Sequence, residues 1–320
     1  MKKAFSILTA LTLASSSFAA TPVIAPDLST KTQIAPRWFG PNAFPVPEMT
    51  DGRIDPSRTF ELAGDFFTGR LADGRDLTYD AFLRLHLPLW TNRAALTVWM
   101  PVVEWWQTDP AVDAARNILS APSKDPGHDS GDVYVSLDIQ ILTEGQVRPS
   151  LLLRSVLKSA SGNNFGYARY YDAPGYFFDL TAGKSFGAFR LAATTGFLCW
   201  QTDNGRQNDA IQYGLTAFYS GPGGLRLSTQ WAGYFGWERY GDAPMTLSAR
   251  AAWRFPLSGI SADSATLGTY APGSAFSGIS GPSSAISGIS APALEPFIML
   301  QHGLHDWPFT QLRAGLLFSF

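Results

Sequence analysis

The chain has 320 residues, of which 45% are hydrophobic, 13% aromatic and only 16% charged, and this composition favours a folded chain over a disordered one. Its 24 lysines and arginines are balanced by 26 aspartates and glutamates, so no basic excess marks a nucleic-acid-binding protein. A single cysteine excludes an intrachain disulfide and a zinc site built on several thiolates. No motif predicts a metal or another cofactor.

Residues 1–19 have the pattern of a secretory signal peptide. Lys2 and Lys3 form its positive start, an apolar stretch follows, and Ser17-Phe18-Ala19 fits the small-x-small rule for cleavage. No later segment supplies the roughly 20 consecutive apolar residues of a transmembrane helix. We therefore expect an exported chain that is periplasmic, secreted or an outer-membrane barrel.

Residues 20–57 are rich in proline and show no regular alternation of apolar and polar residues. The sequence favours an extended periplasmic N-terminal tail here. The alternative is a segment folded into the lumen of a barrel and anchored by Trp38 and Phe39.

From residue 58 onward the apolar residues alternate with period two, in runs long enough for tilted membrane strands. One example is the run from Val133 to Ile141, where every second residue is Val, Leu or Ile. Pro101 interrupts the third run, which predicts a β-bulge there. The predicted strands are 58–71, 77–90, 94–108, 132–143, 147–160, 175–186, 189–202, 210–220, 225–239, 244–256, 294–306 and 309–320.

These runs predict an all-β fold, a transmembrane antiparallel up-and-down β-barrel of about 12 strands over residues 58–320. An even number of strands places both ends of the barrel on one side of the membrane. The alternative, a soluble β-sandwich, would need shorter strands and more frequent turns. The predicted location is the outer membrane of a Gram-negative bacterium, with outer-membrane lipid as a partner.

The last strand ends on an aromatic residue and is apolar at alternate positions. It resembles the C-terminal strand of Gram-negative outer-membrane proteins, and the resemblance implies recognition by the barrel-insertion machinery. The residues of this predicted insertion signal are Leu312, Ala314, Leu316, Phe318 and Phe320.

Residues 257–292 are of low complexity, with ten Ser, six Gly and six Ala, and Ser-Gly-Ile-Ser occurs three times. Such a composition buries little apolar surface, so the sequence predicts a mobile loop.

Charged residues fall on the predicted inward faces, because their burial in lipid would cost several kcal/mol each. Basic residues predominate on the fifth to twelfth predicted strands, where only Asp179 and Glu238 oppose them, and acidic residues predominate on the first, second and fourth, together with Arg84. This segregation predicts a transverse field that orients or selects permeants. A closed lumen with internal ion pairs is the alternative. The lumen-lining candidates are Arg148, Arg154, Lys158, Arg190, Arg226, Arg250, Arg254 and Arg313 on the basic strands, and Glu61, Asp65, Asp80 and Asp138 on the acidic ones.

The preferred functional hypothesis is a channel or porin-like transporter for small solutes, which is not an enzyme. Two alternatives remain open. His128-Asp129-Ser130 resembles the H-x-S element of the outer-membrane phospholipase A family, which implies a lipid hydrolase using His128 and Ser130. A structural or surface-interaction barrel would have a closed lumen and use the loops 109–131 and 161–174.

Several short motifs carry a second family resemblance. They are Gly131-Asp132-Val133, Lys158 to Gly162, Asp172 and Gly183-Lys184. This pattern resembles the outer-membrane family named for the MetA pathway of phenol degradation. The resemblance implies transport of small aromatic compounds.

Overall fold

The computed structural model describes residues 37, 39–71, 73–90, 93–117, 126–162, 174–201, 207–236, 242–257 and 292–320. The predicted signal peptide and nearly all of the low-complexity segment lie outside these residues, as does Trp38.

Twelve long strands and two short ones form the described fold, together with one short helix and one 3-10 turn. The long strands are β1 (Thr59–Leu71), β2 (Gly74–Leu89), β3 (Ala94–Thr108), β5 (Tyr134–Leu142), β6 (Ser150–Lys158), β7 (Gly175–Phe186), β8 (Phe189–Gln201), β9 (Gln207–Ser220), β10 (Leu225–Phe235), β11 (Met245–Trp253), β13 (Ala293–His305) and β14 (Phe309–Ser319). The remaining elements are α2 (Pro110–Asn117), β4 (Gly127–Asp129), η3 (Pro222–Gly224) and β12 (Phe255–Pro256).

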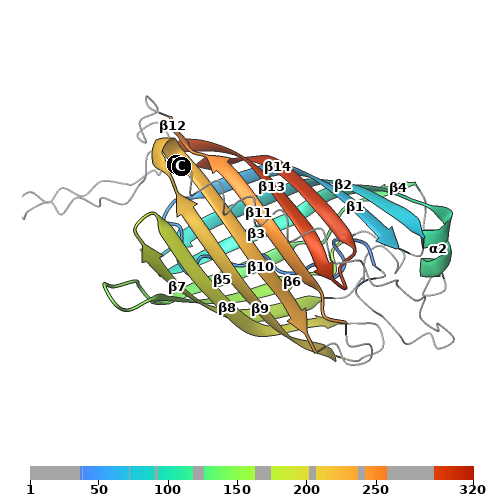
Figure 1. Cartoon of the computed structure of the whole chain (residues 1–320), viewed down its shortest axis with the longest axis horizontal. Coiled ribbons are helices and arrows are strands. Elements are labelled where there is room, and N and C mark those ends of the chain that lie inside the picture. Colours follow the sequence, from blue (N-terminus) through green and yellow to red (C-terminus); the bar gives the residue numbers. More distant parts are fainter. Residues whose placement is uncertain are drawn as a thin grey trace, which may run out of the picture.

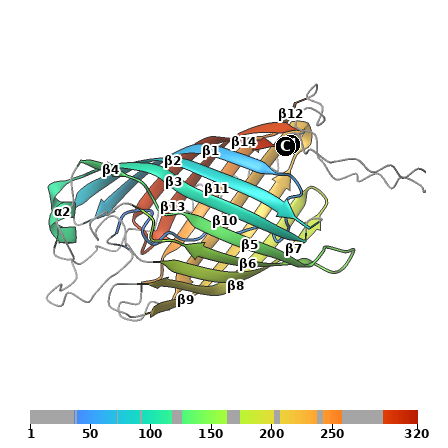
Figure 2. The same ribbon diagram turned by 180° about the vertical axis from the view of Figure 1, so that it is seen from behind.

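The twelve long strands form a closed antiparallel barrel in which each pairs with its neighbours in the chain. The short strand β12 lies between β11 and β13 in the sequence, and β11 pairs directly with β13. The first and last strands, β1 and β14, also pair with each other and so close the barrel. Figures 1 and 2 show the tilted strands from opposite sides. The predicted fold class is confirmed.

The predicted strand order is also confirmed, and the ends differ by a few residues. The strand predicted from residue 147 begins only at Ser150 in β6, because Pro149 has no N–H to donate to a ladder. The bulge predicted at Pro101 is present: Ala81 pairs with Val103 while Phe82 pairs with Pro101, so Val102 is the extra residue.

The barrel has two distinct ends. At the terminal end, Thr59 of β1 pairs with Ser319 of β14. The turns after β2, β5, β7 and β9 lie at this end, and the turn between β7 and β8 is tight because Gly187 adopts a φ of +61°. The opposite end, called the helix end here, carries α2 (Figure 1).

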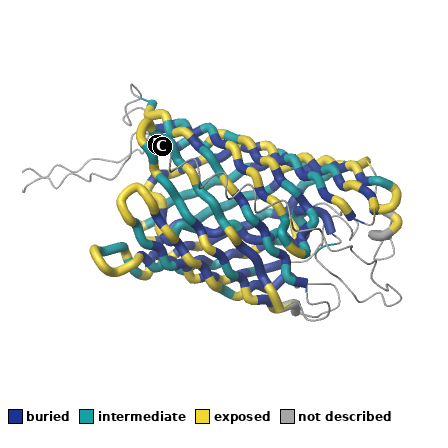
Figure 3. The backbone as a smooth tube through the Cα atoms, in the orientation of Figure 1, coloured by how far each residue is buried: buried dark blue, intermediate teal, exposed yellow. Residues whose placement is uncertain are grey.

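Burial alternates along the strands, as the alternation of buried and exposed segments in Figure 3 shows. In β1 every second residue from Thr59 to Leu71 is buried. The outward positions are mostly apolar; Leu137 and Ile139 of β5 are 43% and 42% exposed. The inward positions include many charged and amide side chains, so the exterior suits lipid and the interior does not.

The predicted insertion-signal residues lie on β14 and at the chain end that follows it. Leu312, Leu316 and Phe320 are among the exposed large hydrophobic residues, and Phe318 stacks on Phe320 with ring centroids 5.6 Å apart. Their recognition by the insertion machinery stays a prediction. Among the described residues, no helix is both long and apolar enough to cross a bilayer.

Leu180 tests the lipid-facing surface, because it lies outward in the middle of β7 and is 38% exposed. Leu180→Arg should lower the free energy of unfolding from lipid vesicles by about 2–4 kcal/mol, as expected for an arginine near the bilayer midplane. Val147→Arg is the control, because Val147 is 91% exposed in the turn between β5 and β6. Equal effects of the two substitutions in urea titrations would contradict the assigned lipid-facing surface.

Candidate functional site

The described residues directly before β1 run through the inside of the barrel from one end to the other. At the helix end, Arg37 pairs with Asp242 and lies 3.1 Å from the Asp306 carboxylate, and these residues are in the connections that follow β10 and β13. At the terminal end, the N–H of Phe320 donates to the carbonyl of Arg58. Residues 39–57 between these contacts are called the lumen segment.

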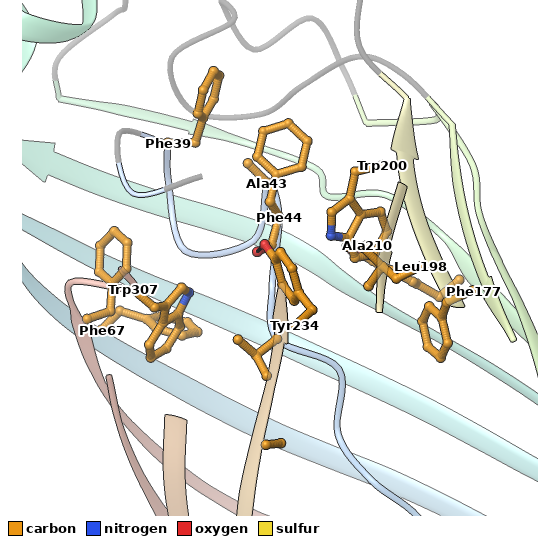
Figure 4. Packing of buried hydrophobic residues seen from close by; sticks show 14 of the residues in the cluster. Phe39, Ala43, Phe44, Phe67, Phe177, Leu198, Trp200, Ala210, Tyr234 and Trp307 are labelled. Atoms are coloured by element: carbon orange, nitrogen blue, oxygen red, sulfur yellow. Dashed lines mark hydrogen bonds between the residues drawn. The ribbon is translucent and has the colours of Figure 1, made fainter. Parts of the chain in front are cut away.

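An aromatic cluster holds the lumen segment in the helix-end half of the barrel (Figure 4). Phe39 packs edge-on against Phe44 at 5.1 Å between ring centroids, and Phe44 lies 6.5 Å from Trp200 of β8. The hydroxyl of Tyr234 in β10 donates to the carbonyl of Phe44 over 3.1 Å. Apolar side chains of the wall and of the segment therefore fill this half of the lumen together.

Side-chain hydrogen bonds to its backbone hold the segment in the terminal-end half. Gln140 of β5 accepts from the N–H of Ile54 and donates to the carbonyl of Gly52, at 3.0 and 3.1 Å. Arg154 of β6 donates to the carbonyl of Glu48 at 2.8 Å, and Arg190 of β8 donates to the carbonyl of Asp51 at 2.8 Å. The segment is thus bound by lumenal side chains and does not join the strand ladder.

These contacts correct the prediction for residues 20–57. Residues 39–57 of that range do not form a free periplasmic tail; they occupy the lumen, which was the alternative interpretation. Residues 20–36 and Trp38 lie outside the described residues. The physical reason is that the segment carries large apolar residues such as Phe39, Phe44 and Met49, which are all buried here.

The inward-facing basic side chains are paired with acidic ones on neighbouring strands or in the connections between strands. Arg154 donates through Nε to Asp179 at 2.9 Å, and Arg190 lies 2.6 Å from the Glu144 carboxylate. Lys158 lies 2.5 Å from Asp132. This local pairing differs from the prediction of opposed basic and acidic walls, because register places acidic partners such as Asp179 beside the basic residues.

Most of the predicted lumen-lining residues lie on inward faces, but two do not. Arg148 is exposed in the turn after β5, where it donates to the carbonyl of Thr143, and Arg254 lies between β11 and β12 at the terminal end. Arg226 and Arg250 both reach Glu295 of β13, at 3.1 and 3.5 Å. The buried inward residues are Arg154, Lys158, Arg190, Arg313, Glu61, Asp65, Asp80 and Asp138.

Sequence reasoning missed the acidic and amide residues of the lumen segment. Asn42 donates to both Asp80 and Glu104, at 2.6 and 2.7 Å, and so bridges two neighbouring carboxylates of the wall. Glu48 contacts Arg84 and Arg313. The only available signal was that these polar residues occur in an otherwise apolar, proline-rich stretch without a strand period.

Glu144 and Asp242, which lie in connections between strands, have shifted pKa values. Burial opposes ionisation of Glu144, but hydrogen bonds from Ser185 and Arg190 outweigh it and lower its pKa to about 2. Burial raises the pKa of Asp242 despite its ion pair with Arg37.

The structure does not assemble a hydrolytic site at the H-x-S element. His128 is exposed in β4, and Ser130 follows that strand with its N–H bonded to the Asp129 carboxylate. Within the described residues, no hydrogen bond joins the side chains of His128 and Ser130 to each other or to another group. No group of three or more described metal-ligating side chains is close enough to hold a metal ion.

Comparison with known proteins identifies the fold. No protein-family model and no curated protein matches the chain. Among solved structures, the COG4313 outer membrane channel from Pseudomonas putida F1 aligns over 86% of this chain and 100% of its own, at a TM-score of 0.56 and 10% identity. The NanC porin aligns over 82% of this chain and 100% of its own, at a TM-score of 0.44 and 9% identity. The chain therefore has the β-barrel fold seen in an outer-membrane channel.

Arg154 tests whether the lumenal ion pairs stabilise the barrel. Arg154→Met should lower the free energy of unfolding by roughly 3–5 kcal/mol, because it leaves the Asp179 carboxylate buried and without its cation. Arg53→Met is the control: its side chain is 49% exposed and, among the described residues, forms its ion pair with Asp51, so a change below about 1 kcal/mol is expected. Similar decreases in the free energy of unfolding of both variants would show that the buried ion pair stabilises the barrel no more than the exposed one.

Proposed function

We propose that this protein is an outer-membrane channel of a Gram-negative bacterium, passing small solutes through a lumen that its own N-terminal segment restricts. The observation that carries the proposal is the lumen segment itself. It lies inside a barrel whose exterior is apolar and whose interior is polar and charged. A barrel of this architecture separates a lipid-facing wall from a passage suited to polar solutes.

The contacts of the lumen segment support an opening by displacement. It is held by hydrogen bonds from side chains such as Gln140 and Tyr234, and by packing of Phe39 and Phe44. Residues 39–57 add no strand to the barrel, so the segment can leave without breaking the ladder that closes the wall.

A structural barrel with a permanently closed lumen is the second candidate function. It is favoured by the local pairing of charges and by the aromatic cluster at the helix end. The two functions differ in whether removal of the segment's side chains opens a conducting path. The resemblance to the MetA-pathway family, with its small aromatic solutes, stays an interpretation of the sequence.

Replacement of the side chains in the segment tests this proposal. Residues 42–52 exchanged for alternating Gly and Ser of the same length should give a larger single-channel conductance in planar bilayers, because the lumen loses its packed side chains. The matched control exchanges the turn residues Gln146, Val147 and Arg148 for Gly and Ser and should behave like the unmodified chain. If the exchanged segment leaves a folded barrel without conductance, the channel proposal is wrong and the closed structural barrel is favoured.

A further inference from the structure

The side chain of Glu48 occupies a site built by arginines of the barrel wall. Its Oε1 accepts from Nη1 of Arg313 in β14 at 2.8 Å, and its Oε2 accepts from Nη2 of Arg84 in β2 at 2.7 Å. The two oxygens of one carboxylate are thus divided between two guanidinium groups. Charge-assisted contacts of this kind are among the strongest hydrogen bonds in proteins.

The wall holds these arginines in place independently of Glu48. Nε and Nη2 of Arg313 both donate to Asp65 of β1, at 2.7 and 2.9 Å, which leaves Nη1 directed at the lumen segment. Arg84 is 3.4 Å from Glu61 through Nη1, which leaves Nη2 for Glu48. Removal of Glu48 would therefore leave one N–H group on each arginine without this acceptor.

Aromatic rings fix the orientation of the same guanidinium groups. The guanidinium carbons of Arg313 and Arg84 lie 4.0 and 5.0 Å from the centroid of the Phe82 ring, and that of Arg250 lies 4.1 Å from the ring of Phe297. Such cation–π contacts stabilise a charged side chain without using its N–H donors. The arginines are therefore preorganised to meet an anion.

Arg250 of β11 adds unused donor capacity to this site. Its Nε and Nη2 atoms are buried and make no hydrogen bond with another described group, although Nη2 is 3.5 Å from the Glu295 carboxylate. Arg250 interacts electrostatically with Glu48. It also lies level with Arg313, because Arg250 pairs in register with Met299, which pairs with Arg313. A buried donor without an acceptor is costly, so this side chain favours an added anion.

We infer that Arg84, Arg250 and Arg313 form a binding site for small carboxylates, which Glu48 occupies while the lumen segment is in place. The inference rests on the proposed channel function and names its solute class: compounds bearing a carboxylate group. Glu48 belongs to the lumen segment and not to the wall, so displacement of the segment would free the arginines for the carboxylate of a solute. Competition for these arginines then couples solute binding to opening.

Chemical rescue tests the site in the full-length protein without requiring conductance. In Glu48→Ala the carboxylate is lost but the three arginines remain, so acetate should raise the midpoint of thermal unfolding saturably, by about 2–4 °C over chloride at equal ionic strength. Asp55→Ala is the control, because this segment carboxylate caps the N–H of Ser57 and contacts none of the three arginines. No acetate effect in Glu48→Ala, or an equal effect in the control, would overturn the inference.

Glu48→Gln provides a second measurement if the alanine variant does not fold. The amide keeps the side-chain volume but removes the charge, so the reversal potential in a KCl gradient should shift toward chloride, and an unchanged value would overturn the inference. The further substitution Arg84→Met should abolish the acetate effect in Glu48→Ala. Folded barrels that show no conductance in the bilayer would contradict the proposed channel. The effect of acetate on thermal unfolding tests the carboxylate site separately.

Discussion

The structure depends on one electrostatic constraint: charged groups placed inside a lipid-embedded barrel must find partners there. The strands alternate apolar and polar residues, so the same pattern that gives the barrel its lipid-facing surface directs arginines and carboxylates inward. A buried charge without a partner is strongly destabilising. The lumenal pairs, such as Arg154 with Asp179 and Arg313 with Asp65, satisfy this requirement between neighbouring strands.

The lumen segment completes this network where the wall alone does not. Glu48 joins Arg84 and Arg313, and Asn42 donates to two adjacent carboxylates that would otherwise repel each other. The helix-end half is different in character, because aromatic side chains from the wall and from the segment fill it. The interior thus combines an apolar cluster with a polar region of arginines, and the segment contacts both.

Much of the barrel was predictable from the sequence, because strand alternation is a local pattern. The run from Val133 to Ile141 indicated β5. Pro101 predicted a β-bulge, and the register shift next to Phe82, which pairs with Pro101, confirms it. Inward placement of Arg154 and Arg313 also follows from alternation, since a strand has only two faces.

The partners of these residues could not be predicted from the alternation, because cross-strand contacts depend on register and the predicted strand ends differ from the observed ones by several residues. The lumen segment was harder still: proline-rich residues without a period do not show whether they lie inside or outside a barrel, and Glu48 gains its role only through contacts distant in sequence.

The most direct test of the account uses a disulfide between the lumen segment and the wall. A Cβ added at Gly214 of β9 would lie 2.5 Å from Cγ of Met49, so cysteines at these two positions are close enough to link. In a Cys199→Ala background, the variant with Met49→Cys and Gly214→Cys should form the disulfide. The oxidised protein should then show no large conductance steps in planar bilayers, and a reductant should bring these steps back. Failure of the cysteines to link in the folded barrel, or identical conductance before and after reduction, would contradict a lumen segment that controls passage.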